Sequence, residues 1–270
     1  MSRRVGRGQA GALRAGRGAW RLARTLLHLG HGVAVMALRF PALDAAGRQQ
    51  RIAWWSAGVL RHMGLTLEVS GRSADGATLL VANHVSWLDI CAIHAVTPQA
   101  RFVSKADVLG WPLLGWLIRG AGTLFIERDR RRDALRVVHA MAAALQAGDT
   151  VAVFPEGTTG RGPSLLPFHA NLLQAALSTG TPVQAVALRY ADAEQRFSDA
   201  VEFVGETTLL QSVWRVATAD GVTVHVDLLP ALPTAGLDRR TLAAELHGLI
   251  ATRLHAQAAI TRSSGALATS

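Results

Sequence analysis

Residues 78–96 read TLLVANHVSWLDICAIHAV, in which a short apolar run is followed by a polar turn and a longer apolar segment. The run at residues 78–82 has the length of a buried strand, and residues 87–96 have the length of a helix. His84 falls in the turn, and Asp89 follows in the first part of the helix. The carboxyl edge of a parallel α/β sheet is open to ligands, so this strand end is a candidate site.

The rest of the chain continues this alternation of short apolar runs and longer amphipathic segments. Alternating strands and helices are typical of a three-layer α/β fold with a largely parallel sheet flanked by helices, and 270 residues suffice for one such domain. Strands are predicted at residues 78–82, 101–104, 123–126, 150–154, 183–190, 201–204 and 222–228. Helices are predicted at residues 87–96, 111–119, 131–146, 168–179, 209–216 and 239–258.

The chain is expected to divide into four parts. Composition predicts that its basic start is disordered and that its last residues, rich in Ser, Ala and Thr, form a flexible tail. The parts are a basic arm at 1–19, N-terminal membrane-associated helices at 20–70, the α/β domain at 71–259 and the tail at 260–270.

Positive charge is concentrated at the N-terminus. Residues 1–39 contain eight Arg and no Asp or Glu, which leaves 20 basic and 19 acidic residues in the remainder. An Arg-rich arm that runs into an apolar segment favours an anionic membrane surface as a partner. A nucleic-acid partner is not expected, because it would need a basic face on the folded core. A solvated arm and a cleaved signal peptide are the alternatives.

The apolar segment at residues 20–40 is interrupted by Arg24, His28 and His31, which are costly at a bilayer centre. It is therefore expected to lie in the interface or to span the membrane only marginally. Residues 51–64 have apolar side chains at helical spacing and predict a second helix, which packs on the core or rests on lipid.

The single cysteine, Cys91, excludes an internal disulfide and a cysteine-built metal site, and it fits a reducing cytoplasm. The ten histidines show no convincing ligand spacing, so no metal and no resident cofactor is expected. These features favour the cytoplasmic face of the inner membrane, with the protein attached peripherally or by a single span.

Two further strand ends carry polar residues. Residues 151–162 read VAVFPEGTTGRG, where a buried strand ends in a turn that exposes backbone N–H groups, and Arg161 can add charge-assisted hydrogen bonds to an anion. The alternative is an ordinary glycine-rich turn. Residues 123–128 read TLFIER and would bring Arg128 to the same sheet edge as His84 and Glu156 if the strands are neighbours.

The spacing of His84 and Asp89 permits a carboxylate to fix one tautomer of an imidazole, whose other nitrogen can then act as a general base. Because His and Asp occur at this separation by chance in many chains, an alternative is a loop histidine with Asp89 at a helix N-terminus.

Taken together and in order, these segments resemble the lysophosphatidic acid acyltransferases, also called 1-acylglycerol-3-phosphate acyltransferases, within the glycerolipid acyltransferase group. NHVSWLD is similar to the family's N-H-x4-D motif and FPEGTTGRG to its E-G-T block. Residues 101–128 are similar to its second block and TPVQAVAL to its proline-led fourth block. The resemblance covers about residues 79–189.

The resemblance implies that His84 deprotonates the acceptor hydroxyl as this attacks a thioester carbonyl, and that Asp89 orients the imidazole, without a covalent acyl-enzyme. The donor would be acyl-CoA or acyl-carrier protein, and the acceptor the sn-2 hydroxyl of a lysophospholipid, 1-acyl-glycerol-3-phosphate, which gives phosphatidic acid.

The resemblance also implies acceptor-binding roles. Arg128 would hold the acceptor phosphate together with Gly157 and Thr158. Glu156 would organise that loop or contact the acceptor, and Lys105 would help at the acceptor or carrier end.

The sequence departs from the family at positions that concern the acceptor. Thr159 stands where the family commonly has Arg, His169 where it has Lys, and Ala185 where a second proline is common. An E-G-T-T sequence also resembles members that acylate lyso-ornithine lipid, an acceptor without phosphate, which is the alternative substrate.

Two other classes of protein fit these residues less well. A non-catalytic membrane lipid-binding protein would not need the His84 and Asp89 pair. An α/β-hydrolase would need a G-x-S-x-G nucleophile elbow, which the sequence lacks. The resemblance to the family, together with the His84 and Asp89 pair, therefore favours an O-acyltransferase.

Overall fold

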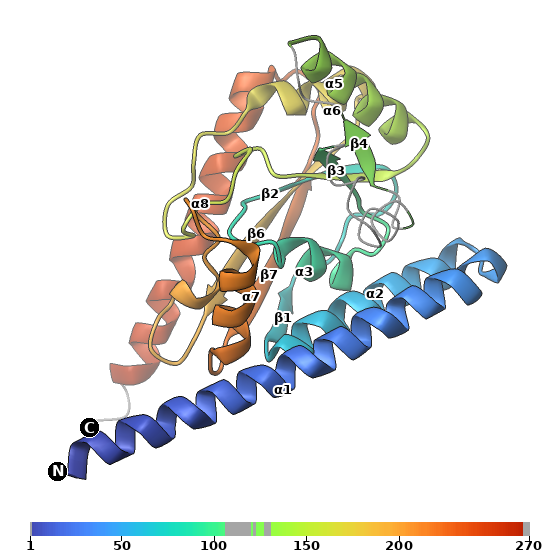
Figure 1. The fold of residues 1–270 in the computed structure, drawn as a ribbon. Coiled ribbons are helices and arrows are strands. Elements are labelled where there is room, and N and C mark those ends of the chain that lie inside the picture. Colours follow the sequence, from blue (N-terminus) through green and yellow to red (C-terminus); the bar gives the residue numbers. More distant parts are fainter. Residues whose placement is uncertain (1, 106–119, 121–122, 127–130, 267–270) are drawn as a thin grey trace.

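A mixed, mostly parallel sheet forms the centre of the molecule (Figure 1). The computed structural model describes residues 2–105, 120, 123–126 and 131–266. In these residues the sheet has seven strands in the order β1-β7-β6-β2-β5-β3-β4. Neighbouring strands run parallel except for β6 and β7, which are antiparallel. The strands are β1 (Thr66–Ser70), β2 (Thr78–Ala82), β3 (Arg101–Lys105), β4 (Leu124–Ile126), β5 (Thr150–Val153), β6 (Val183–Ala191) and β7 (Thr223–Leu232).

Helices cover both faces of the sheet, and each face has its own hydrophobic core. Leu80 and Ala82 of β2 point into one core with residues of α2, α3 and α7, whereas Leu79 and Val81 point into the other with residues of α5, α6 and α8. A strand buried on both faces reads as a continuous apolar run, which is why β2 was predictable. The helices are α1 (Ser2–Leu38), α2 (Ala45–Met63), α3 (Asp89–Val96), α5 (Arg131–Gln146), α6 (Gln174–Thr179), α7 (Leu209–Thr218) and α8 (Arg239–Ala266), and the short 3-10 helices are Phe40–Ala42, Ala170–Leu173 and Asp199–Val201.

The N-terminal helices α1 and α2 form a long hairpin beside the domain (Figure 1). Helix α1 begins at Ser2 and so includes residues 2–19 of the segment for which disorder was predicted. Arg21 donates hydrogen bonds to the backbone carbonyls of Ala217 and Ala219 at the end of α7, and Arg17 pairs with Asp220 at 2.8 Å. These arginines thus join α1 to the α/β domain. None of the described helices is long and apolar enough to cross a membrane.

Four other segments differ from the prediction. The predicted strand at 201–204 is wrong, because Ser198 caps the short helix Asp199–Val201 and Val201 is buried in the core. Strand β1 was not predicted, since most of its side chains are exposed and it has no long apolar run. The 3-10 helix Ala170–Leu173 precedes α6 where one helix was expected, and α8 continues into the expected tail. The helix predicted at 111–119 lies outside the described residues.

Candidate active site

The ends of β2 and β5 bring two of the predicted motifs together. These strands are parallel neighbours, with Val81 opposite Val153, so the segments that follow them leave the same edge of the sheet. Asn83 fixes the first segment: its side chain donates to the Leu188 carbonyl at 2.9 Å and accepts from the Leu188 amide at 2.7 Å. The expectation that His84 and Glu156 lie at one sheet edge is confirmed.

His84 and Asp89 form a hydrogen-bonded pair. His84 Nδ1 lies 2.8 Å from Asp89 Oδ2, and the Asp89 side chain is fully buried. The same oxygen accepts from the backbone amides of Val85 at 2.7 Å and Ser86 at 2.9 Å. The Asp89 carboxylate therefore stabilises the turn between β2 and α3 by hydrogen bonds to its backbone. The same carboxylate fixes the orientation of the His84 ring, which belongs to this turn.

The His84 ring is held on a second side by an aromatic contact. It stacks on Phe154, with 4.0 Å between ring centroids and 11° between the ring planes. The His84 side chain is 19% exposed, and no described group hydrogen-bonds to its Nε2. Because Nδ1 faces a carboxylate, the favoured neutral tautomer carries its proton on Nδ1 and leaves the Nε2 lone pair free.

Glu156 fixes the backbone of His84. Its Oε1 accepts from the His84 amide at 2.7 Å and its Oε2 from the Leu166 amide at 2.7 Å, while the Gly160 amide donates to the His84 carbonyl at 2.7 Å. Burial raises the pKa of Glu156, and the two backbone hydrogen bonds oppose that shift. Since both carboxylate oxygens are engaged and the residue is buried, Glu156 organises the loop.

The segment after Glu156 is an exposed turn beside His84. Gly157 has a φ of 71°, a left-handed conformation that favours glycine, and a Cβ there would lie 3.0 Å from the His169 ring. Gly157, Thr158 and Arg161 are exposed, and no described group forms a hydrogen bond or an ion pair with the Arg161 side chain. Thr159 differs, because its hydroxyl donates to the Phe203 carbonyl. The Gly157 amide already donates to the Phe154 carbonyl at 3.1 Å, so the groups that the turn can present to a ligand are the Thr158 hydroxyl and the Arg161 cation.

Two of the predicted binding residues are described only in part or not at all. Lys105 is the last residue of β3, where its backbone is opposite Ile126 of β4. The Lys105 side chain and the whole of Arg128 lie outside the described residues. The parallel order β2-β5-β3-β4 directs the carboxyl ends of all four strands to the His84 edge.

Sequence reasoning missed Tyr190 and Phe154. The Tyr190 hydroxyl donates to Asp89 Oδ1 at 2.7 Å, and both side chains are buried. A buried tyrosine hydroxyl needs a hydrogen-bond partner, so a lone tyrosine at the end of the apolar segment VQAVALRY was a usable signal. For Phe154 the signal was weaker, because a phenylalanine next to a strand end is normally a core residue.

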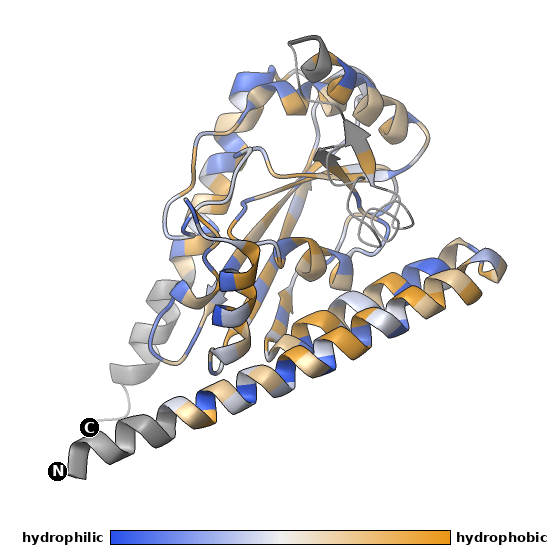
Figure 2. Cartoon of the chain, in the orientation of Figure 1, coloured by the Kyte–Doolittle hydropathy of each residue, from blue (hydrophilic) through white to orange (hydrophobic). Residues whose placement is uncertain are grey.

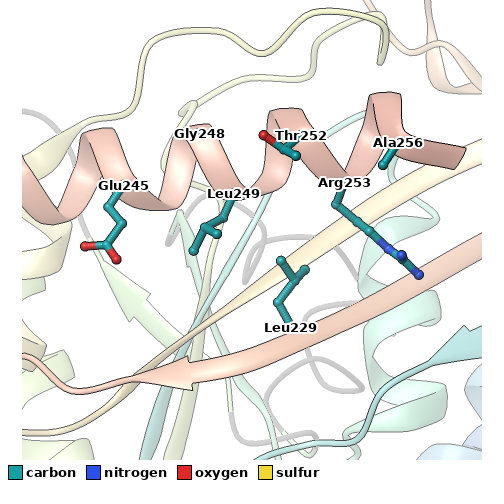
Figure 3. A pocket seen from close by; sticks show the side chains of 7 residues that line it. All are labelled: Leu229, Glu245, Gly248, Leu249, Thr252, Arg253 and Ala256. Carbon is teal, nitrogen blue, oxygen red and sulfur yellow. The ribbon is translucent and has the colours of Figure 1, made fainter. Parts of the chain in front are cut away.

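A cavity of about 420 Å³ lies elsewhere, between α8 and β7 (Figure 3). Leu229, Leu249 and Arg253 are among its lining residues. None of the predicted site residues that the structure describes lines it, and the cores place α8 on the opposite face of the sheet from α3 and Val85.

Comparison with known proteins shows the family of the chain. The Acyltransferase family profile matches residues 66–189. The lyso-ornithine lipid O-acyltransferase of Pseudomonas aeruginosa is 38% identical over 242 residues, which cover 88% of this chain and 92% of that protein. The 1-acyl-sn-glycerol-3-phosphate acyltransferase of Neisseria meningitidis is 42% identical over 175 residues, which cover 64% of this chain and 68% of that protein.

A solved structure shares the fold. The crystal structure of the 1-acyl-sn-glycerophosphate acyltransferase from Thermotoga maritima aligns with a TM-score of 0.64 at 19% identity, covering 88% of this chain and 98% of that one. At this identity the likeness concerns the fold alone. The family profile and the relatives carry the assignment: the chain belongs to the acyltransferase family, with the 1-acylglycerol-3-phosphate and lyso-ornithine lipid acyltransferases as its relatives, and it is an O-acyltransferase.

Proposed function

We propose that the protein transfers a fatty acyl group from acyl-CoA or acyl-carrier protein to the free hydroxyl of a lyso-lipid, with His84 as the general base. The observation that carries this proposal is the state of the imidazole: Nδ1 is engaged by a buried carboxylate, whereas Nε2 has no described partner. This is the arrangement that a base needs in order to accept a proton at one defined nitrogen.

The reaction follows from that arrangement. His84 Nε2 takes the proton of the acceptor hydroxyl while the hydroxyl oxygen bonds to the thioester carbonyl carbon. When the tetrahedral intermediate collapses, the carbon–sulfur bond breaks, the thiolate leaves, and the imidazolium returns the proton to sulfur. Asp89 stabilises the imidazolium between these steps, because its carboxylate lies 2.8 Å from Nδ1. The products are an ester and a free thiol.

Our first candidate for the acceptor is 1-acyl-glycerol-3-phosphate, acylated at its sn-2 hydroxyl to give phosphatidic acid. Thr158 and Arg161 are exposed next to His84 and offer a hydroxyl and a cation, which are suitable ligands for a phosphate group, and Gly157, which has no side chain, allows the phosphate to approach the backbone. Lys105 and Arg128 are proposed to add positive charge to the same site.

A second acceptor, lyso-ornithine lipid, is favoured by Thr159. Its hydroxyl is already engaged by the Phe203 carbonyl, so this position supplies no phosphate ligand. The Pseudomonas aeruginosa relative, 92% of whose length is covered by the alignment, is named for that acceptor. The chemistry at His84 would be the same with either lipid.

An acceptor panel with purified protein in mixed micelles tests the assignment. With a labelled acyl-CoA or acyl-carrier protein, we expect labelled phosphatidic acid from lysophosphatidic acid, at a rate above that of acyl-ornithine lipid formation. Replacing Thr159 with Arg should lower the KM for lysophosphatidic acid by about threefold to tenfold, because a charge-assisted hydrogen bond is added. Product formed from lyso-ornithine lipid alone would contradict the first candidate and support the second.

We also propose that α1 attaches the protein to a membrane surface, with the cytoplasmic face of the inner membrane as the expected one. Figure 2 shows hydrophobic residues along α1 and α2. Trp20, Leu26 and Leu27 are 64%, 67% and 76% exposed, which is unusual for such large apolar side chains. Arg residues on the same helix can bind anionic headgroups, so lipid is the partner that suits both the apolar and the basic side chains.

Liposome flotation tests this attachment. Replacing Leu26 and Leu27 together with Glu should reduce retention on vesicles that contain anionic lipid by at least about tenfold, because the contacts of two exposed leucines with lipid are lost and two negative charges are added. Leu135 on α5 is similarly exposed, at 62%, so Leu135→Glu is a matched control that should retain binding. Equal retention of both variants would contradict the proposed role of α1.

A further inference from the structure

We propose that Tyr190 is a positioning residue of the reaction, which holds the Asp89 carboxylate oriented and ionised so that His84 can act as the base. The inference rests on the proposed role of His84. Tyr190 acts on neither substrate directly, because its hydroxyl donates to Asp89 Oδ1.

The length of β6 brings Tyr190 to the site. Strand β2 ends at Ala82, which is opposite Val186, whereas β6 continues to Ala191. The overhanging part of β6 lies beside the turn that follows β2, as the hydrogen bonds between Asn83 and Leu188 show. Side chains alternate along a strand, so Leu188 and Tyr190 point to the same face and Tyr190 meets Asp89.

The two oxygens of Asp89 are not equivalent. Oδ2 accepts three hydrogen bonds, from His84 Nδ1 and from the amides of Val85 and Ser86. Among the described residues, only Tyr190 bonds to Oδ1, at 2.7 Å. The carboxylate is fully buried, so solvent has no access to replace that bond. An unpaired oxygen on a buried carboxylate would strongly destabilise the ionised form.

The surrounding groups make the tyrosine a donor. Burial raises the pKa of Tyr190, and the neighbouring Asp89 charge raises it further. Burial and Asp89 likewise raise the pKa of Cys91 on α3 to about 12. Both the Tyr190 hydroxyl and the Cys91 thiol are therefore neutral at physiological pH. Glu156, the other acidic residue near His84, accepts a hydrogen bond from the His84 backbone amide. Among the described residues, Asp89 and Glu156 are the carboxylates beside His84, and the Tyr190 hydroxyl is the neutral group that donates to the remaining oxygen of Asp89.

The hydroxyl has two consequences for the reaction. It prevents rotation of the carboxylate, which keeps Oδ2 in line with His84 Nδ1. It also stabilises the deprotonated His84 and Asp89 pair more than the pair that carries one additional proton, because the hydrogen bond is stronger when the pair has a net negative charge.

The test is Tyr190→Phe, which removes the hydroxyl and keeps the ring. We expect kcat to fall about tenfold, because the Asp89 carboxylate can then rotate and no longer keeps the His84 ring in one orientation, while the KM values of lysophosphatidic acid and acyl-CoA change by less than about twofold. The acidic limb of the kcat profile should move to higher pH, because the variant pair retains its extra proton more readily. A purely structural role would not move that limb.

Two further variants separate positioning from folding. Thr97→Val removes a buried hydroxyl that has no hydrogen-bond partner, just after α3, and should leave kcat and the pH profile unchanged. In an Asp89→Asn background, Tyr190→Phe should lower kcat by less than about twofold, because the charge on which it acts is absent.

The outcomes distinguish the two proposals. Full activity of His84→Ala would overturn the proposed function itself. An inactive His84→Ala protein combined with an unchanged kcat and pH profile in Tyr190→Phe would overturn only the role of Tyr190. An equal loss from Tyr190→Phe in the wild-type and Asp89→Asn backgrounds would also overturn it, since the effect would then not pass through Asp89.

Discussion

Replacing His84 with Ala is expected to reduce kcat by about 10³-fold or more, since general-base assistance contributes on the order of 10² to 10⁴ and the orientation of the hydroxyl is lost with it. The side chain is held by Asp89 on one edge and by Phe154 on one ring face, so its Nε2 has one defined position. No other histidine ring forms a described contact with Asp89. A second base is therefore not expected to compensate.

The measurement is acyl transfer from a labelled thioester by purified His84→Ala protein, compared with His139→Ala as the control. His139 is exposed on α5, which covers the opposite face of the sheet, so its replacement should leave kcat unchanged. The melting temperature of both variants is measured in parallel to establish that they are folded. A His84→Ala protein that retains more than about one tenth of the activity would refute the role of His84 as the base.

The central strands and α5 were predictable because their burial leaves a clear pattern. Strand β2 was predicted with the correct limits, and so was α5 at Arg131–Gln146. All five residues of β2 are buried, and a strand covered on both faces must be apolar throughout. The position of His84 and Glu156 at one edge followed from parallel strands, and β2 and β5 are indeed neighbours.

The edges of the sheet were not predictable for the converse reason. Strand β1 pairs with β7 through backbone hydrogen bonds, and most of its side chains are exposed, so its sequence TLEVS has no buried pattern. Residues 201–204 have an apolar composition, but Val201 enters the core from a short helix. Burial of a single side chain does not determine whether the backbone around it is extended.

The hydrogen-bond partners of Glu156 could not be predicted from the motif that contains it. From the sequence, Glu156 was predicted to lie in an anion-binding turn, with two alternative roles: it would organise the loop, or it would contact the acceptor. In the structure its two oxygens accept the amides of His84 and Leu166, which are 72 and 10 residues away in sequence. Such contacts depend on tertiary structure, so neither they nor the Tyr190 bond could be read from spacing.

Replacing Asp89 with Asn is the second change with a large expected effect, a fall in kcat on the order of 10³-fold, because the buried negative charge that stabilises the imidazolium is removed. An amide has one acceptor oxygen, and only the Tyr190 hydroxyl can turn from donor to acceptor. The Asn oxygen should therefore face His84 Nδ1 and the amides of Val85 and Ser86, while its NH2 group faces Tyr190. The geometry is kept and the charge is lost.

This substitution isolates the electrostatic contribution of the carboxylate. Without the negative charge the imidazolium formed in the reaction is less stable, so the acidic limb of the kcat profile should move to lower pH, opposite to the shift expected for Tyr190→Phe. Asp75→Asn is the control, because Asp75 is exposed in the loop before β2, at the amino end of the strand. An Asp89→Asn protein with nearly full kcat would mean that Asp89 only shapes the turn, and that the charge state of the imidazole does not limit the transfer.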